Sequence, residues 1–245
     1  MRQVLLGFIT IVLFAGSCTP NKQKNEQDTA TQVEDDGIQV IKRFFRNSDR
    51  IEYEIPVVKG TTIKHGVQKR YYLYGSLYSI IPYVAGKKQG VAYTYYQAAL
   101  DKEPQVWKEQ PYEDDQLNGT CKRYHRDGTL QAEYEYKEGL RAVGLKEFSE
   151  SGKAIIQPDL LLSKHKIPAG YLIVARLSDD DKNADYYIGE LVEGKYMPKN
   201  MKGLQNRNGV SETVVKETSG TVTITAEYST RYRNRGVVSA QIDLP

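Results

Sequence analysis

The sequence predicts a mainly β protein: an antiparallel β-hairpin repeat meander followed by a small all-β C-terminal domain that is sandwich- or barrel-like. Three observations support this fold class. Glycines recur at matching intervals, aromatic residues recur with them, and the last third of the chain alternates apolar and polar residues without a glycine rhythm. Helical periodicity is nowhere sustained, and Tyr95 to Lys102 is the only weak candidate for a helix.

The first segment, residues 1–17, has the features of a secretory signal peptide. Arg2 supplies a positive charge, and Val4 to Phe14 form an apolar stretch too short to span a bilayer as a helix. The next residues, Ala-Gly-Ser-Cys, resemble the lipobox of bacterial lipoproteins. That resemblance implies lipid attachment at Cys18 and, since Thr19 rather than Asp follows it, an outer-membrane location. The alternative is an ordinary cleaved signal with a cysteine nearby by chance.

Residues 18–37 are predicted to be a flexible tether between the membrane and the folded part. They are rich in Asn, Lys, Gln, Glu, Asp and Thr and cannot bury enough apolar surface to order themselves. The chain has only two cysteines, Cys18 and Cys121. If Cys18 carries lipid, Cys121 has no disulfide partner within the chain, and we interpret it as a small packing residue.

Residues 38–156 are predicted to be the repeat domain. The spacing Gly-x₈-Gly-x₁₀-Gly occurs twice, beginning at Gly66 and at Gly119. Asp49 stands where Gly75 and Gly128 stand in their units, and Asp115 stands where Gly86 stands. Asp and Gly both tolerate the backbone conformations of tight turns. The third unit carries an insertion around Leu100 to Pro111. Units are predicted to start near Val40, Gly66, Gly90, Gly119 and Gly144.

Each unit contains two strand-like arms around a turn. In the clearest unit, Asp127-Gly128 forms the turn, a strong local signal for a hairpin. The second arm places Leu130, Ala132, Tyr134 and Tyr136 on one face and Gln131, Glu133 and Glu135 on the other. Successive hairpins then form an antiparallel meander in which each hairpin covers its neighbour's edge.

The series Gly-x-x-Lys-Arg-Tyr-x-x-Asp-Gly-x-Leu-x-x-Glu-x-x-Tyr-x-x-Gly at 119–139 resembles the variant MORN repeat. Bacterial proteins that carry this repeat are often labelled antitoxin-like. The match covers about Val40 to Lys153, and Tyr83-Val-Ala-Gly departs from it by lacking the usual acidic residue. The resemblance implies a curled or flat β-sheet used for contacts and fixes no catalytic residues. The antitoxin label fits poorly with a secreted, lipidated chain.

Thirteen of the nineteen tyrosines lie between residues 53 and 136. In one interpretation they pack across strands; in another, some of them form a solvent-facing platform that contacts a partner or stacks on sugar rings. Adjacent tyrosines must point to opposite faces of the sheet, so some are expected outside a one-sided core. The candidate contact residues are Tyr72, Tyr95, Tyr96, Tyr124 and Tyr134.

Residues 157–245 are predicted to form the small all-β domain, with a continuation of the repeat sheet as the alternative. Residues 157–168 are a transitional stretch that contains three consecutive leucines. Five strand-like runs in about 80 residues favour a small antiparallel sandwich or barrel. These runs are 170–177, 186–192, 210–216, 221–228 and 236–244.

One loop of this segment carries a weak calcium candidate. Its oxygen-bearing residues have the spacing of a calcium-binding loop, and such ligands suit a hard cation. Ala184 stands where that loop requires glycine, and strands rather than helices flank it, so a solvated loop between two strands is the favoured interpretation. The candidate ligands are Asp179, Asp181, Asn183, Asp185 and Glu190.

No catalytic, metal-spaced or phosphate-binding motif is evident, and the histidines at 65, 125 and 165 are scattered. The formal net charge is only +3, and Arg231, Arg233 and Arg235 fit a solvated hairpin end, so no nucleic-acid partner is expected. We expect a non-catalytic lipoprotein without a cofactor that binds or scaffolds a protein through its tyrosine-rich repeat surface. A glycan-binding cell-envelope lipoprotein is the alternative, and a secreted enzyme with an unrecognised site is a third class.

Overall fold

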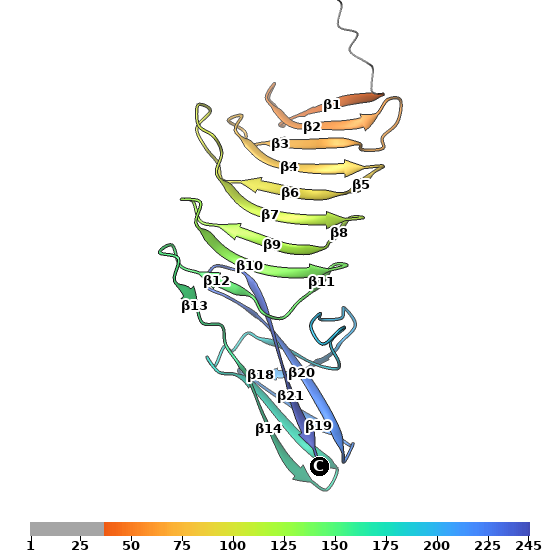
Figure 1. Cartoon of the computed structure of the whole chain (residues 1–245), viewed down its shortest axis with the longest axis vertical. Coiled ribbons are helices and arrows are strands. Elements are labelled where there is room, and N and C mark those ends of the chain that lie inside the picture. The colour runs from red at the N-terminus through yellow and green to blue at the C-terminus, as the bar shows by residue number, and fades with distance from the viewer. Residues whose placement is uncertain (1–36) are drawn as a thin grey trace, which may run out of the picture. The chain divides into compact units, whose positions relative to one another are not determined.

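A long antiparallel sheet forms the first part of the chain described by the computed structural model, which covers residues 37–245 (Figure 1). Ten of its thirteen strands follow one another in chain order, and three two-residue strands pair beside them. No helix occurs within 37–245. The predicted hairpin meander is therefore confirmed. The strands are β1 (Ile38–Phe44), β2 (Ile51–Val58), β3 (Gly66–Tyr71), β4 (Leu77–Val84), β5 (Lys87–Lys88), β6 (Gly90–Tyr95), β7 (Val106–Glu113), β8 (Gln116–Leu117), β9 (Gly119–Tyr124), β10 (Leu130–Lys137), β11 (Leu140–Arg141), β12 (Lys146–Phe148) and β13 (Ala154–Ile155).

A β-bulge recurs in each of the four long hairpins. In the first, Arg43 pairs with Tyr53 and Phe44 pairs with Ile51, which leaves one residue of the second strand unpaired. The same shift of register recurs in β3–β4, β6–β7 and β9–β10. A bulge bends its strand and re-aims the extra side chain. The four bulge residues are Glu52, Tyr78, Trp107 and Gln131.

The glycine that starts a unit also packs against proline in the preceding strand. Gly119 has a φ of +109°, and a Cβ added there would lie 3.2 Å from Cγ of Pro111. Glycine is thus required both for its backbone conformation and for its lack of a side chain. The same arrangement recurs for Gly66 with Pro56 and for Gly90 with Pro82.

One detail of the predicted repeat is confirmed and another needs correction. Asp115 has a φ of +69°, as expected for a residue that replaces glycine in a turn. Asp49 is not such a residue: in the first hairpin the left-handed conformation falls on Asn47, with a φ of +56°. The reason is a longer loop, which closes when the amide of Phe45 donates to the carbonyl of Arg50.

The weak helix candidate at 95–102 is wrong. Strand β6 runs through Tyr95, and the chain then forms a loop in which the amide of Tyr96 donates to the carbonyl of Gln105. This loop is the insertion of the third unit. The insertion ends where β7 begins, so the predicted limit at Pro111 was too late.

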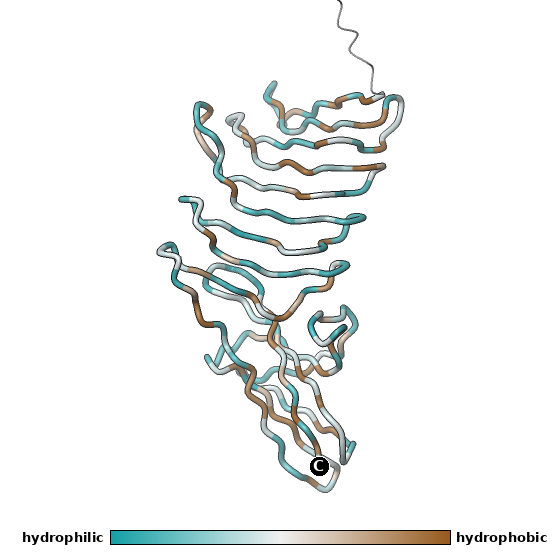
Figure 2. The backbone as a smooth tube through the Cα atoms, viewed as in Figure 1, coloured by the Kyte–Doolittle hydropathy of each residue, from teal (hydrophilic) through white to brown (hydrophobic). Residues whose placement is uncertain are grey.

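Two four-stranded antiparallel sheets follow the long sheet, in the orders β14-β15-β19-β18 and β17-β16-β20-β21. Apolar side chains from both sheets form one core, including Ile173, Leu177, Tyr186 and Ile224. Figure 2 shows hydrophobic residues distributed along these strands. The strands are β14 (Leu160–Ile167), β15 (Gly170–Leu177), β16 (Asp185–Ile188), β17 (Lys202–Leu204), β18 (Asn206–Arg207), β19 (Val210–Val215), β20 (Gly220–Ser229) and β21 (Arg235–Leu244).

Four of the five predicted runs in this segment match β15, β19, β20 and β21 to within one residue at each end. The run at 186–192 was too long, because β16 ends at Ile188. Strand β14 was missed, since most of its side chains are exposed and three leucines in a row give no alternation. The short strands β17 and β18 were missed as well. The change from one long sheet to two small ones falls between Ile155 and Leu160.

Candidate functional site

Strand alternation gives the long sheet two faces, which we call face A and face B. One row of directly paired residues crosses each face through all four hairpins. The row on face A is Arg43, Tyr53, Arg70, Ser79, Thr94, Lys108, Arg123, Ala132 and Glu147. The row on face B is Lys42, Glu54, Lys69, Ile80, Tyr93, Glu109, Lys122, Glu133 and Lys146.

The predicted contact tyrosines Tyr72 and Tyr96 form a hydrogen-bonded ladder between hairpins. The hydroxyl of Tyr72 donates to the backbone carbonyl of Tyr95 at 2.9 Å, and that of Tyr96 donates to the carbonyl of Tyr124 at 2.8 Å. One hairpin further, Nε2 of His125 lies 3.0 Å from the carbonyl of Phe148. Because a carbonyl oxygen only accepts, Nε2 carries the hydrogen. His125 therefore takes the place of a tyrosine in this ladder.

Each ladder residue also packs on the bulge residue of its own hairpin. The rings of Tyr72 and Tyr78 meet edge to face with centroids 5.0 Å apart, and those of Tyr96 and Trp107 lie 5.8 Å apart. In the fourth hairpin, Nε2 of Gln131 lies 3.4 Å from Nδ1 of His125. The bulges therefore place the side chains on which the ladder rests.

The other predicted contact tyrosines are held on the sheet as well. The hydroxyl of Tyr124 donates to Oε2 of Glu109 at 2.9 Å, and burial followed by this carboxylate raises the pKa of Tyr124 to about 12. Tyr95 stacks on Tyr93, with centroids 6.5 Å apart. Tyr134 meets Tyr136 at 6.0 Å, and burial raises the pKa of Tyr134 to about 12. Of these contacts, only that between Tyr124 and Glu109 crosses from one strand to the next, whereas Tyr93–Tyr95 and Tyr134–Tyr136 are neighbours along a single strand.

Face B carries an apolar row of exposed valines and buried or half-buried prolines beside its charged row. Val40 pairs with Pro56, Val67 with Pro82, and Val91 with Pro111. The three valines are 52 %, 48 % and 36 % exposed, respectively. We call these six residues the apolar row. The row has no signature in the sequence, because the valines and prolines lie in different strands and come together only through the strand register.

The apolar row ends at the fourth hairpin, where Thr120 pairs with Glu135. There the C-terminal segment covers face B: Nζ of Lys195 and the hydroxyl of Tyr196 each donate to Glu135 at 2.6 Å. The Lys195 and Tyr196 donors hold the pKa of Glu135 below its ordinary value. Face B is thus already used once, within the chain, as a docking surface.

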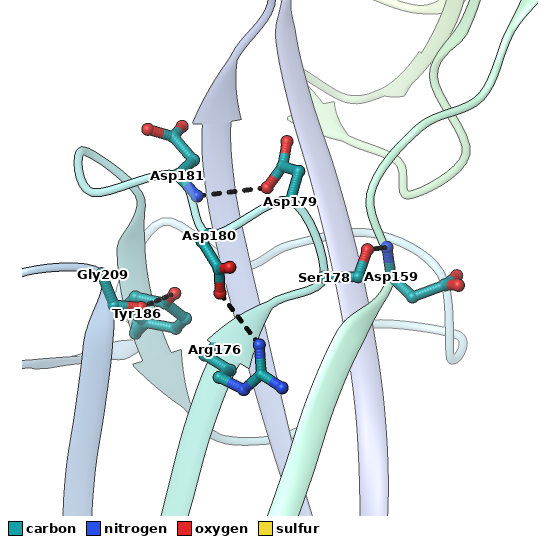
Figure 3. A network of polar contacts seen from close by, with 8 residues as sticks. All are labelled: Asp159, Arg176, Ser178, Asp179, Asp180, Asp181, Tyr186 and Gly209. Carbon is teal, nitrogen blue, oxygen red and sulfur yellow. Dashed lines mark hydrogen bonds and ion pairs between the residues drawn. The ribbon is translucent and has the colours of Figure 1, made fainter.

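The weak calcium candidate does not form a converging site. Figure 3 shows two of its residues, Asp179 and Asp181, and the bond between them. Oδ1 of Asp179 accepts from the amide of Asp181 at 3.2 Å, and Oδ1 of Asp181 accepts from the amide of Asn183 at 3.0 Å. Glu190 accepts from Thr223 at 2.8 Å, in a different part of the fold. Within 37–245, no group of three or more His, Cys, Asp or Glu side chains is arranged to hold a metal ion. The loop's carboxylates stabilise its own backbone turns instead.

The remaining titratable candidates also have structural partners. Cys121 is completely buried, and burial raises the pKa of its thiol to about 12, which agrees with a packing role. The guanidinium of Arg141 lines a cleft of about 390 Å³ beside the C-terminal sheets. It donates to the hydroxyl of Tyr136 and to the carbonyl of Arg235, so it is held within the protein. Cys18 lies outside the described residues.

Comparison with known proteins finds no matching family model, no similar curated protein and no similar solved structure. In the part of the chain that the structure describes, no helix has the length and apolar character required to cross a bilayer.

Proposed function

We propose that this protein is a lipid-anchored, non-catalytic module of the cell envelope that binds a partner protein through its repeat sheet. The anchor is the lipobox-like cysteine, Cys18, and the variant MORN-like pattern at 119–139 supports a contact function. The single observation that carries the proposal is the apolar row on face B. Its three exposed valines lie on alternate strands of a regular sheet, with prolines on the strands between them. A single exposed apolar side chain would need no explanation, but a row of them does.

The geometry of the apolar row favours a protein over a sugar as the ligand. Aliphatic side chains and proline rings supply apolar area, whereas sugar binding relies on open aromatic rings and polar groups. Three of the five candidate tyrosines, Tyr72, Tyr96 and Tyr124, donate their hydroxyls to groups of the chain itself. Face B also contacts Lys195 and Tyr196 of this chain at the fourth long hairpin, next to the apolar row. A partner protein would extend that contact along the sheet.

Site-specific photocrosslinking in native membranes tests this proposal. A photoreactive amino acid replaces Val67 in one variant and Val91 in another, and crosslinked products are identified by mass spectrometry. The matched control replaces Val214, which is 49 % exposed on a strand of the C-terminal sheets. We expect the same partner protein from positions 67 and 91 and not from position 214.

A second pair of variants tests whether the apolar row contributes to affinity. Val67→Arg and Val91→Arg place a charge in the contact, which we expect to abolish crosslinking from the other valine position while leaving the unfolding transition in place. Products from all three positions alike, or none from either valine, would exclude the row as the contact. Binding to glycans without any protein product would favour the glycan-binding alternative.

A further inference from the structure

Charge is distributed differently on the two faces of the repeat sheet. The row on face B alternates in sign at most positions, so Lys122, for example, lies between Glu109 and Glu133. From β1 to β10, the row on face A contains the cations Arg43, Arg70, Lys108 and Arg123 and no carboxylate. Opposite charges in directly paired positions stabilise a sheet, whereas like charges there destabilise it. Face A lacks this compensation.

Comparison of equivalent repeats locates the uncompensated charge. Arg70 pairs with the bulge residue Glu52 of the preceding hairpin, with Nη2 2.9 Å from Oε1. Arg123 occupies the equivalent position two hairpins later, and there the bulge residue is Trp107. Trp107 offers Arg123 its ring, 5.5 Å from the guanidinium carbon, instead of a carboxylate. The substitution of tryptophan for an acidic residue leaves the charge of Arg123 without a counter-ion.

Two further cations lie in the same place. Nζ of Lys108 lies 3.9 Å from the centroid of Trp107, and the guanidinium of Arg126 lies 4.7 Å from the centroid of Tyr96, whose ring packs on Trp107. We call Tyr96, Trp107, Lys108, Arg123 and Arg126 the cationic cluster. Among residues 37–245, no ion pair includes Lys108, Arg123 or Arg126.

The cluster is built to hold its cations close together despite their repulsion. The guanidinium of Arg123 donates to the carbonyl of Arg233 and to Oδ1 of Asn234, while its Nε is buried with no hydrogen-bond partner in the described part of the chain. Burial, and then the charge of Arg123, lowers the pKa of Lys108. An anion at this position would offset the repulsion between Lys108 and Arg123.

We propose that the cationic cluster binds an acidic segment of a protein. The cluster lies on face A, opposite the apolar row on face B, so it is a second contact site and does not depend on the contact proposed for face B. The cations lie over the aromatic rings, so the groups presented to a ligand are ammonium and guanidinium rather than an open ring face on which a sugar would stack. A carboxylate-rich peptide matches these groups.

The chain contains its own reporter for such binding. Trp107 is the only tryptophan of the sequence, so intrinsic tryptophan fluorescence reads the cluster directly. The full-length protein is titrated with a hexaglutamate peptide, with polygalacturonate as a carboxylated glycan and with inorganic phosphate, and calorimetry measures the affinities. We expect hexaglutamate to change the fluorescence of Trp107 and its binding to weaken as salt is raised.

Matched variants separate the cluster from the general charge of the protein. Lys108→Gln and Arg123→Gln should each weaken hexaglutamate binding about tenfold, the loss expected for one charge-assisted contact. Lys122→Gln removes the same charge from the strand that carries Arg123 but from face B, and should leave binding unchanged. Lys108→Gln is the safer variant, because Arg123 also donates to the turn at Arg233 and Asn234.

Three outcomes would overturn the inference: no binding of hexaglutamate to the wild type, an equal loss in Lys122→Gln, or tight binding of polygalacturonate or phosphate with none of hexaglutamate. The proposed function is judged separately, by crosslinking from Val67 and Val91.

Discussion

The side-chain amide of Asn234 donates to Oε1 of Glu147 at 2.6 Å, and both residues are almost completely buried, at 4 % and 2 % exposure. This bond joins the last hairpin of the repeat sheet to the turn between β20 and β21. The hydroxyl of Thr230 donates to the same carboxylate oxygen at 2.6 Å, and Gln157 donates to the other oxygen at 3.3 Å. Glu147 is therefore a buried carboxylate that is satisfied only when the two parts of the chain are in contact.

Asn234→Ala should destabilise the protein by about 1–3 kcal/mol, because it leaves the buried carboxylate of Glu147 short of one donor. Urea unfolding followed by the fluorescence of Trp107 measures the loss. Asn200→Ala, at an exposed position, serves as the control and should change the free energy of unfolding by less than about 0.5 kcal/mol. Equal stability of Asn234→Ala and the wild type would mean that the Glu147 contact contributes nothing to joining the two parts.

The ladder between hairpins gives a second prediction. Tyr96→Phe removes one hydroxyl-to-carbonyl bond while keeping the ring that packs on Trp107, so it should cost about 0.5–1.5 kcal/mol. Tyr74→Phe removes a hydroxyl from a ring that is 64 % exposed and should be neutral. The free energies of unfolding of the two variants, measured side by side in urea, give the difference. If both variants lose a similar free energy of unfolding, the hydrogen bond from Tyr96 to the carbonyl of Tyr124 does not stabilise the protein.

The raised pKa of Tyr124 predicts a loss of stability in alkali. An unfolded tyrosine loses its proton near pH 10, whereas burial and Glu109 hold the pKa of Tyr124 at about 12 in the folded protein. Between these values the folded state binds more protons than the unfolded state, so the contribution is complete below about pH 10 and is lost as the pH rises towards 12. Urea unfolding of Tyr124→Phe between pH 8 and 11.5 should therefore show a shallower decline than that of the wild type. The stability of Glu109→Gln should decline with pH less steeply than that of the wild type and more steeply than that of Tyr124→Phe. Parallel curves for the wild type and Tyr124→Phe would contradict the assignment of the raised pKa to Tyr124.

The anchoring prediction concerns residues outside the described structure. If Cys18 is the lipidated N-terminus, Cys18→Ser should move the protein from the membrane fraction to the soluble fraction and abolish incorporation of labelled palmitate. Cys121→Ser is the matched control, because Cys121 is buried in the repeat sheet and should leave localisation unchanged. Membrane association and unchanged palmitate labelling of Cys18→Ser would show that the anchor lies elsewhere.

Structural features that are decided by residues adjacent in the sequence, such as turns, could be predicted. Features that are decided by the register in which two strands pair could not. The turn glycines and Asp115 were found because a left-handed backbone conformation restricts the residue type locally. The first hairpin shows the limit: Asn47 and Asp49 both suit a turn, and only the loop closure between Phe45 and Arg50 decides between them. Strand β14 was missed because its exposed residues carry no alternating pattern.

The candidate site was only partly predictable for the same reason. The tyrosines were found by composition, but their roles follow from which carbonyl or carboxylate lies opposite each hydroxyl, as Glu109 does for Tyr124. The bulges decide this, and a bulge such as that at Trp107 has no signature in the sequence. The apolar row and the cationic cluster likewise exist only once strands more than ten residues apart are paired.

Substitution of the repeat glycines separates backbone strain from steric contact. Gly119 and Gly144 both start a unit and both have positive φ values, of +109° and +93°. Alanine is strained at either position, which should cost about 1–3 kcal/mol. At Gly119 the added Cβ would also lie 3.2 Å from Pro111, whereas nothing lies within 4 Å at Gly144. Gly119→Ala should therefore be the less stable variant in urea, because the contact adds to the strain. If the two variants lose equal stability, the proline packing is not part of what specifies glycine at the start of each unit.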